Sequence, residues 1–152
     1  MVEKTISIQL IDTDSFDYEQ EKVLREEILR IPLGMHLRPQ DIEGEEEQIH
    51  FVARNDRGVI GCLLLQVINA QTLKFRQAAV EEKRQRQGIG RALVDAGMDW
   101  ARANGFTRAI AHVRYYARPF WEQSGFRVEG DTFEEVGLKH FFMTREIKKE
   151  DE

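Results

Sequence analysis

Apolar and polar residues alternate along several stretches of the chain with the period of two that is typical of β-strands. Strands are predicted over residues 5–11, 48–54, 59–68, 72–80, 108–113, 126–128 and 138–147. The 59–68 stretch is almost continuously apolar, which predicts a central strand buried on both faces. Residues that favour turns separate the stretches, as in Asn55-Asp56-Arg57-Gly58.

Three other stretches have the apolar spacing or the end signals of helices. Helices are predicted over 17–30, 88–104 and 119–124, and 32–47 reads as a long loop. The predicted order is a strand, a helix, three strands, a helix, a strand, a helix and further strands. This order indicates an α+β protein in which helices pack on the faces of a mixed sheet.

Length and charge narrow the class of protein. The 152 residues fit one domain, and we expect 1–152 to fold as a unit. The net charge of −5 argues against a nucleic-acid binder, which would usually be basic. No run reaches the ~18 apolar residues of a membrane span, and the N-terminus lacks the apolar stretch of a secretion signal. We therefore expect a soluble cytoplasmic protein that binds neither nucleic acid nor membrane.

A glycine-containing loop follows the predicted strand 72–80 and opens the predicted helix 88–104. Its sequence is Gln85-Arg86-Gln87-Gly88-Ile89-Gly90-Arg91. The first N–H groups of a helix have no partner within the helix, and together with the helix dipole they favour an anion. Glycine lets the backbone approach closely, and arginines add charge-assisted hydrogen bonds to phosphate. The loop therefore predicts an anion site.

Several interpretations of this loop compete. A Walker-type loop requires Gly-Lys-Ser/Thr, whereas Arg91-Ala92 follow Gly90. A dinucleotide fingerprint requires a third glycine, where Leu93 stands, and an acid about 20 residues further on, where Thr107 and Arg108 stand. A third pattern, Gln/Arg-x-x-Gly-x-Gly/Ala, is matched at every fixed position. A simple turn before a helix is the remaining alternative.

That third pattern belongs to the GNAT superfamily of N-acetyltransferases, which the chain resembles over nearly its whole length. Ala78-Ala79-Val80 is similar to the strand end that precedes the loop in that superfamily. Residues 117–126 resemble its second signature, Ala-x-x-Phe-Tyr-x-x-x-Gly-Phe. Residues 25–29 and 133–140 are similar to segments of the ElaA/YjcF-like acetyltransferases.

The resemblance implies a three-layer fold with a mixed, mostly antiparallel sheet, in which the fourth and fifth strands splay apart. It also implies that acetyl-CoA is the co-substrate, without a metal, and that a primary amine attacks it directly in a ternary complex. Arg114 could reach a CoA phosphate or a substrate carboxylate, and Arg25 could reach the latter; the alternative for both is surface ion pairing. The expected cofactor-binding residues are Ala78, Ala79, Val80, Gln85, Arg86, Gln87, Gly88, Ile89, Gly90, Arg91, Arg114 and Phe120.

Three residues are candidate catalytic groups. His140 is the first choice for the base that deprotonates the amine, because histidine titrates near neutral pH; the alternative is a histidine satisfied by a backbone carbonyl. Glu81 could hold the amine or deprotonate it through water, or be a solvated loop acid. Trp121 stands where relatives carry the tyrosine that protonates the thiolate, and an indole N–H is not an acid near neutral pH. Tyr115 or Tyr116 could substitute, of which we choose Tyr116, or both could be packing aromatics.

The remaining features support plainer interpretations. Glu43 to Glu47 read as a solvated loop, His50 and His112 as packing histidines, and Cys62 as a core residue. The acceptor could be a small-molecule amine or a protein amine, and the oligomeric state stays open, a homodimer included. Trp121 motivates an alternative function, a non-catalytic CoA-binding or regulatory module.

Overall fold

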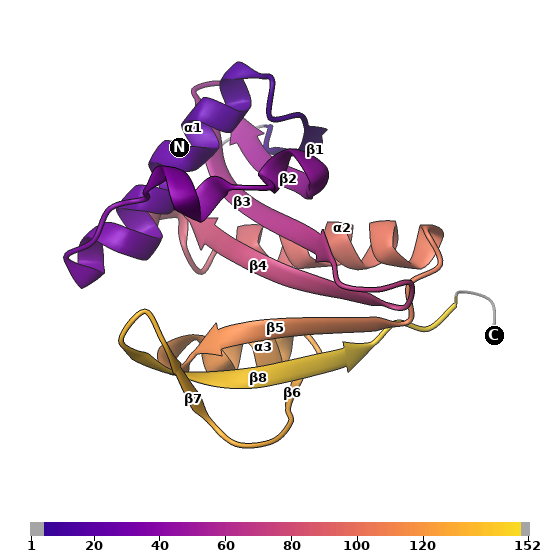
Figure 1. The fold of residues 1–152 in the computed structure, drawn as a ribbon. Helices are drawn as coiled ribbons and strands as arrows, with labels where there is room; N and C mark the ends of the chain where they lie inside the picture. The colour runs from indigo at the N-terminus through magenta and orange to yellow at the C-terminus, as the bar shows by residue number, and fades with distance from the viewer. Residues whose placement is uncertain (1–4, 150–152) are drawn as a thin grey trace.

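The computed structural model describes residues 5–149, and the strands of this part of the chain form one mixed sheet (Figure 1). Its eight strands follow the order β1-β2-β3-β4-β5-β8-β6, with β7 paired to β8. They are β1 (Ser7–Ile11), β2 (Ile49–Asn55), β3 (Gly58–Val67), β4 (Thr72–Val80), β5 (Arg108–Arg114), β6 (Arg127–Val128), β7 (Phe133–Glu135) and β8 (Leu138–Glu146). The pairing of β4 with β5 is parallel and the other described pairings are antiparallel, which confirms the expected mixed, mostly antiparallel sheet.

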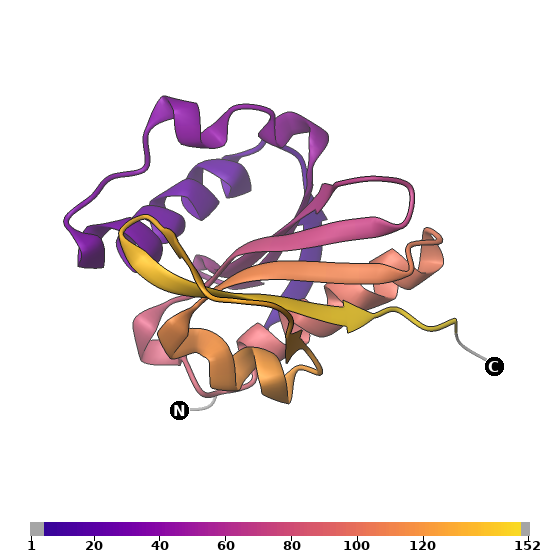
Figure 2. The same ribbon diagram turned by 60° about the horizontal axis from the view of Figure 1, so that its bottom comes forward.

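Helices cover both faces of this sheet (Figure 2). Helix α1 (Phe16–Arg25) lies on one face, whereas α2 (Ile89–Ala103) and α3 (Arg118–Gln123) lie on the other, so the three expected layers are present. The chain continues from α1 through a π-helical turn, η1 (Glu26–Arg30). Short 3₁₀ turns make up the rest of the helical structure: η2 (Ile31–Leu33), η3 (Pro39–Ile42), η4 (Glu45–Glu47), η5 (Glu82–Arg84) and η6 (Tyr115–Ala117).

The core has one part on each face of the sheet. On the α2 face, Leu63 and Leu65 of β3 pack with Leu93 of α2 in the larger apolar cluster. On the α1 face, Cys62 packs with Leu24 in a smaller one. Strand β3 is therefore buried on both faces, as its apolar sequence predicted. Cys62 is fully buried, and burial raises the pKa of its thiol, which confirms its core role.

The expected separation of β4 and β5 is present. Their parallel pairing runs from Thr72 opposite Arg108 to Phe75 opposite Ala111, and then stops, although both strands continue. Beyond this point β4 carries a bulge, with Gln77 at a φ of 56° and a shift in its register with β3. A bulge bends and twists the strand that carries it. Strand β4 consequently turns away from β5, and the two strands diverge in Figure 1.

A hairpin between β7 and β8 was missing from the sequence prediction. Its two-residue turn is Val136-Gly137, with φ values of 46° and 75°. Positive φ at both central residues is the geometry that suits the twist of a tight hairpin. The hairpin brings Glu135 beside the start of β8, opposite Leu138 in the register. Within the described chain, none of the helices has the length and apolar character needed to span a membrane.

Candidate active site

The glycine loop forms an open helix start. Gly88 is the N-cap of α2 and has a left-handed φ of 85°, and no side chain caps the helix. The N–H groups of the first turn are therefore directed at the loop without a side-chain acceptor. The Gln85 side chain donates a hydrogen bond of 2.9 Å to the carbonyl of Val80, which ties the loop to the end of β4.

The two sequence signatures meet at Gly90. A Cβ atom there would lie 3.1 Å from the Phe120 ring and 3.7 Å from the Val80 side chain. The absence of a Cβ at Gly90 therefore lets Phe120 of α3 pack directly on the first turn of α2. The structure thus brings together the end of β4, the loop and the second signature, which are far apart in sequence.

Half of the expected cofactor-binding residues could contribute only backbone groups. Ala79 and Ile89 are buried, and Ala78 and Val80 pack against the core. On the β5 side, no strand pairs with residues 76–80 in the described chain, so that edge of β4 is open. Arg91 lies at the surface, 3.5 Å from Asp95, and Arg86 and Gln87 are exposed. The loop therefore has accessible side chains around an open backbone.

A second group of side chains lies on the face that carries α1. His140 is 2 % exposed, and its Nδ1 lies 2.9 Å from the Leu138 carbonyl oxygen. A carbonyl only accepts hydrogen bonds, so this nitrogen carries the proton and Nε2 holds the lone pair of the neutral ring. Nε2 lies 3.8 Å from Oε2 of Glu135. The histidine is held by a backbone carbonyl, as one alternative predicted.

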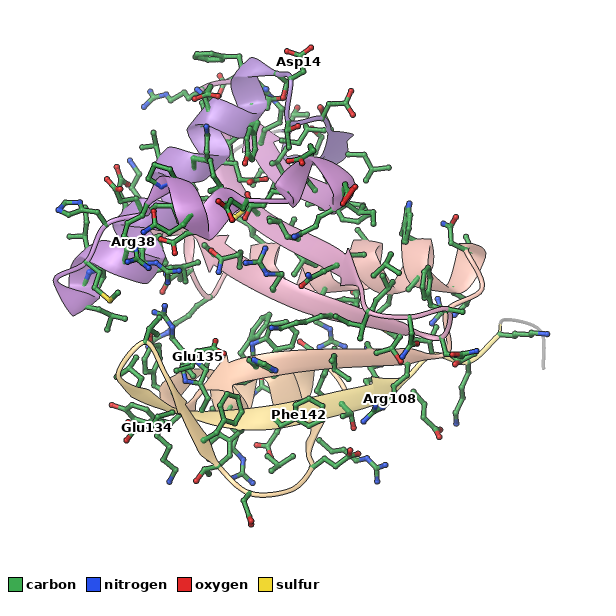
Figure 3. All side chains as sticks on the ribbon, viewed as in Figure 1. Asp14, Arg38, Arg108, Glu134, Glu135 and Phe142 are labelled. Carbon is green, nitrogen blue, oxygen red and sulfur yellow. The ribbon has the colours of Figure 1, made fainter. Side chains whose placement is uncertain are left out.

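Glu135 joins two histidines. Its Oε1 lies 2.9 Å from Nδ1 of His112, while Oε2 faces His140. The hydrogen bond from His112 lowers the pKa of the Glu135 carboxyl, against the opposing effect of partial burial. Nearby Lys74 is half-buried, and desolvation lowers the pKa of its ammonium group. Figure 3 shows Glu135 on the lower part of the molecule and Arg38 on the upper part.

His112 and Glu135 belong to this group of side chains, although neither was among the site residues expected from the sequence. His112 was interpreted as a packing residue, and Glu135 was not singled out within the segment 133–140. The usable signal was Val136-Gly137, because a tight turn there pairs Glu135 with the strand of His140. In the described part of the chain, no group of three or more His, Cys, Asp or Glu side chains has an arrangement that could hold a metal ion.

The other two candidate catalytic residues lie in separate surroundings. The Glu81 backbone N–H donates to the Ile60 carbonyl at 2.8 Å, and its carboxylate lies 3.3 Å from Nε of Arg84. No hydrogen bond or ion pair among residues 5–149 connects Glu81 with His140. Tyr116 is 56 % exposed, and its hydroxyl accepts a hydrogen bond of 3.0 Å from Arg114. Glu81 therefore leads into the glycine loop, whereas Tyr116 stands beside the end of β5.

The two candidate arginines have different environments. Arg114 donates 2.7 Å to the Leu29 carbonyl of η1, so its guanidinium lies on the α1 face rather than at the glycine loop. Arg25 is fully buried and bonds to Glu45 at 2.6 and 2.8 Å and to Glu21 at 3.0 Å. These carboxylates occupy Arg25 and leave it poorly placed to reach a substrate.

Trp121 belongs to the core. It is 6 % exposed, and its ring centroid lies 5.5 Å from that of Phe120 and 4.9 Å from that of Phe126. Both rings meet it edge to face, an attractive arrangement for aromatic pairs. The indole therefore stabilises the packing of α3 against the sheet.

Comparison with known proteins identifies the type of fold. The sequence model of the acetyltransferase (GNAT) family matches residues 10–126. A candidate N-acetyltransferase from Lactobacillus plantarum superposes with a TM-score of 0.85 at 20 % identity, covering 95 % of this chain and 100 % of that one. Escherichia coli ElaA gives 0.77 at 16 % identity, over 93 % and 99 % of the two chains. A GNAT family acetyltransferase from Elizabethkingia anophelis, solved with acetyl-CoA bound, gives 0.72 at 18 % identity, over 95 % and 99 %.

Proposed function

The chain belongs to the acetyltransferase (GNAT) family, and from that membership we propose that it transfers an acetyl group from acetyl-CoA to a primary amine. One observation carries the proposal. The open edge of β4 leads into the uncapped helix start at Gly88, with Phe120 packed on Gly90 at the same place. An extended chain that ends in a pyrophosphate, such as coenzyme A, fits this arrangement.

We infer that the donor uses mainly backbone groups. The pantetheine arm would add to the open edge at Ala78 to Val80, in the way that a strand adds to a sheet. The pyrophosphate would accept hydrogen bonds from the first-turn N–H groups of α2, where the helix dipole also favours an anion. Arg86 and Arg91 would supply the charged side chains around it.

His140 is the proposed base. An alkylamine has a pKa of about 10.4, so only about one in a few thousand is neutral at pH 7, and a base is needed. The lone pair on Nε2 of His140 can accept the amine proton, because Nδ1 is held by the Leu138 carbonyl. The resulting imidazolium would be stabilised by Glu135, whose carboxylate faces Nε2.

In the proposed transfer, the amine attacks the thioester directly while acetyl-CoA and the amine are both bound in a ternary complex. The amine nitrogen bonds to the thioester carbonyl carbon while a proton passes to His140, and the carbon–sulfur bond then breaks. The thiolate takes a proton from Tyr116, whose O–H stays available because its oxygen accepts from Arg114. The phenolate then regains a proton from solvent, and the imidazolium of His140 releases its proton to solvent. Glu81 is the second candidate base and would act through water; its carboxylate is paired with Arg84.

The wider proposal is a single N-acetyltransferase domain over 1–152 that acts in the cytoplasm without a metal. The alternative is a non-catalytic module that only binds CoA. Titration calorimetry with acetyl-CoA and CoA tests donor binding, and absence of binding at high micromolar concentration would contradict both functions. Release of CoA with a broad panel of small amines and peptide amines, above the rate in water alone, separates the enzyme from the module.

A substitution at Gly88 tests the position of the donor. In Gly88→Glu a carboxylate would lie at the proposed pyrophosphate position, so CoA affinity should fall at least about 10-fold. A Cβ at Gly88 meets no atom within 4 Å, so the cost to folding comes from its φ of 85° alone. Gly105→Glu is the matched control, because Gly105 lies beyond the other end of α2 with a φ of 82° and equally open space. Equal CoA affinity in the two variants would place the donor elsewhere.

A further inference from the structure

Arg30 has an unusual environment for a guanidinium. It is the last residue of η1 and is partly buried. Its Nε is buried without a hydrogen-bond partner, and none of the described hydrogen bonds or ion pairs involves its side chain. A buried, unsatisfied donor on a charged group is costly and therefore requires an explanation.

A second arginine lies close to it without an acidic partner. Arg114 bonds to the carbonyl of Leu29, the residue before Arg30, and to the hydroxyl of Tyr116. Both acceptors are neutral, and three of the five guanidinium N–H groups of Arg114 stay available. Burial lowers the pKa of Arg30, Asp41 partly opposes this, and the charge of Arg114 lowers it further. Each of the two guanidinium groups therefore lies in the electrostatic field of the other positive charge.

The neighbouring carboxylates are already engaged. Asp41 accepts hydrogen bonds from the backbone N–H of Arg38 at 2.8 Å and from its guanidinium at 3.2 Å. Glu45, further along the same segment, accepts two hydrogen bonds from Arg25. The positive charge of Arg30 and Arg114 therefore lacks a dedicated counter-charge among the described residues.

The two arginines lie where β4 and β5 have separated, on the side where we place the acceptor. Turn η1 packs on β4, and Arg114 ends β5, so the pair bridges the two strands where they have separated. Arg114 is also the direct register partner of His140. Side chains opposite each other in an antiparallel pair have Cβ atoms about 5 Å apart. A group held by the arginines therefore lies within a few bond lengths of the proposed base.

We propose that Arg30 and Arg114 bind the carboxylate of the acceptor, so that the substrate class is short amino-carboxylates, such as amino acids. The inference rests on the proposed acetyl transfer. A planar carboxylate has two acceptor oxygens, which suit guanidinium forks. It would satisfy the orphaned Nε, neutralise the paired positive charge and leave the amine of the same molecule beside His140.

The test compares acids with their amides. CoA release from acetyl-CoA is measured for the twenty common amino acids and for their carboxamides, which keep the amine and lack the negative charge. At least one acid should have a kcat/KM about 10-fold above that of its amide. In Arg30→Gln the value for the acid should fall about 10-fold, while that for the amide changes less than about twofold. Arg30→Lys, with the charge but without the fork, should fall between.

Matched variants and a binding measurement separate the outcomes. Arg38→Gln is the control, because its guanidinium is already paired with Asp41, and it should keep the preference for the acid. Equal rates for acids and amides, or an unchanged preference in Arg30→Gln, would overturn the inference while leaving acetyl transfer intact. If no amine releases CoA, the proposed acetyl transfer fails, and the carboxylate site is then tested by titration calorimetry of the same acids and amides with CoA present. Equal binding of acids and amides, or no binding of either, would overturn the inference that the arginines bind a carboxylate.

Discussion

The two nitrogens of His140 have separate roles in the proposed reaction. Nδ1 donates to the Leu138 carbonyl, which fixes the ring and its tautomer, and Nε2 faces Glu135 at 3.8 Å. The second oxygen of Glu135 is occupied by His112. A buried ring with one fixed nitrogen loses little orientational freedom when it accepts a proton, as a base in a preorganised site requires.

His140→Gln tests this role. Glutamine keeps polar atoms in the pocket but cannot take up the amine proton, so kcat/KM should fall about 100-fold or more. CoA affinity should stay within about twofold, because the donor site lies at Gly88. Thermal unfolding of the variant must accompany the kinetics, because the side chain is buried. His36→Gln, at an exposed histidine, is the control and should keep full activity. A loss equal in both variants, or none in His140→Gln, would remove His140 as the base.

The sequence predicts residues that act through a local motif better than residues brought together by pairing. The glycine loop and the end of β4 are contiguous, so the pattern alone located the open helix start at Gly88. Glu135 reaches His112 only because β7 folds back on β8, and β8 pairs with β5. The role proposed for Arg30 depends on Arg114, which is distant from it in the sequence. No local pattern carries such information, since each side chain by itself looks like an ordinary surface group.

At the scale of elements, the segment 32–47 differs most from its prediction. Its acidic end, Glu43 to Glu47, was expected to be solvated, but Glu45 is 1 % exposed and accepts hydrogen bonds from Arg25, Tyr18 and Arg76. The acidic run therefore contains a buried anchor between exposed neighbours. Composition alone suggested a solvated face, because three consecutive glutamates hide the one that is paired. The bulge at Gln77 is likewise invisible in the alternation pattern of β4.

Glu45→Gln should release this anchor. Removing one partner of a buried ion pair leaves Arg25 without its main counter-charge and costs about 3–5 kcal/mol of unfolding free energy. Urea unfolding followed by circular dichroism measures the loss. Glu46→Gln is the matched control at the next residue, which is exposed, and should change stability by less than about 0.5 kcal/mol. Similar stability of the two variants would show that Glu45 does not hold the segment.

At the scale of the whole molecule, the sheet joins two parts that are continuous at one end and open at the other. Strands β1 to β4 carry α1, β5 to β8 carry the proposed base, and parallel pairing connects them only as far as Phe75 and Ala111 (Figure 1). The order of elements and the mixed sheet followed from sequence periodicity and resemblance. The proposed acceptor side did not, because its side chains come from η1, β5, β7 and β8, which only the complete fold places together.

The buried network that holds α1 and η4 on the sheet also determines how stability responds to pH. For Glu45, burial alone would raise the pKa, but the hydrogen bonds and charge of Arg25 outweigh it and lower the pKa. For His50, burial alone would lower the pKa, but the hydrogen bond and charge of Glu21 outweigh it and raise the pKa. Glu45 therefore contributes stability above its unfolded pKa, and this is lost as pH falls. His50 contributes stability below its unfolded pKa, and this is lost as pH rises through its folded pKa.

The contribution of Glu45 and His50 to the unfolding free energy should accordingly be highest between about pH 4.3 and pH 6.5, the unfolded pKa values of the two groups. Urea unfolding across this range measures the profile. In His50→Gln the decline on the alkaline side should become shallower, while the acidic decline that Glu45 causes remains. The overall stability of that variant will also be lower, so the slope with pH is the quantity that decides. An alkaline decline of unchanged slope in His50→Gln would mean that the Glu21–His50 pair does not couple protonation to folding.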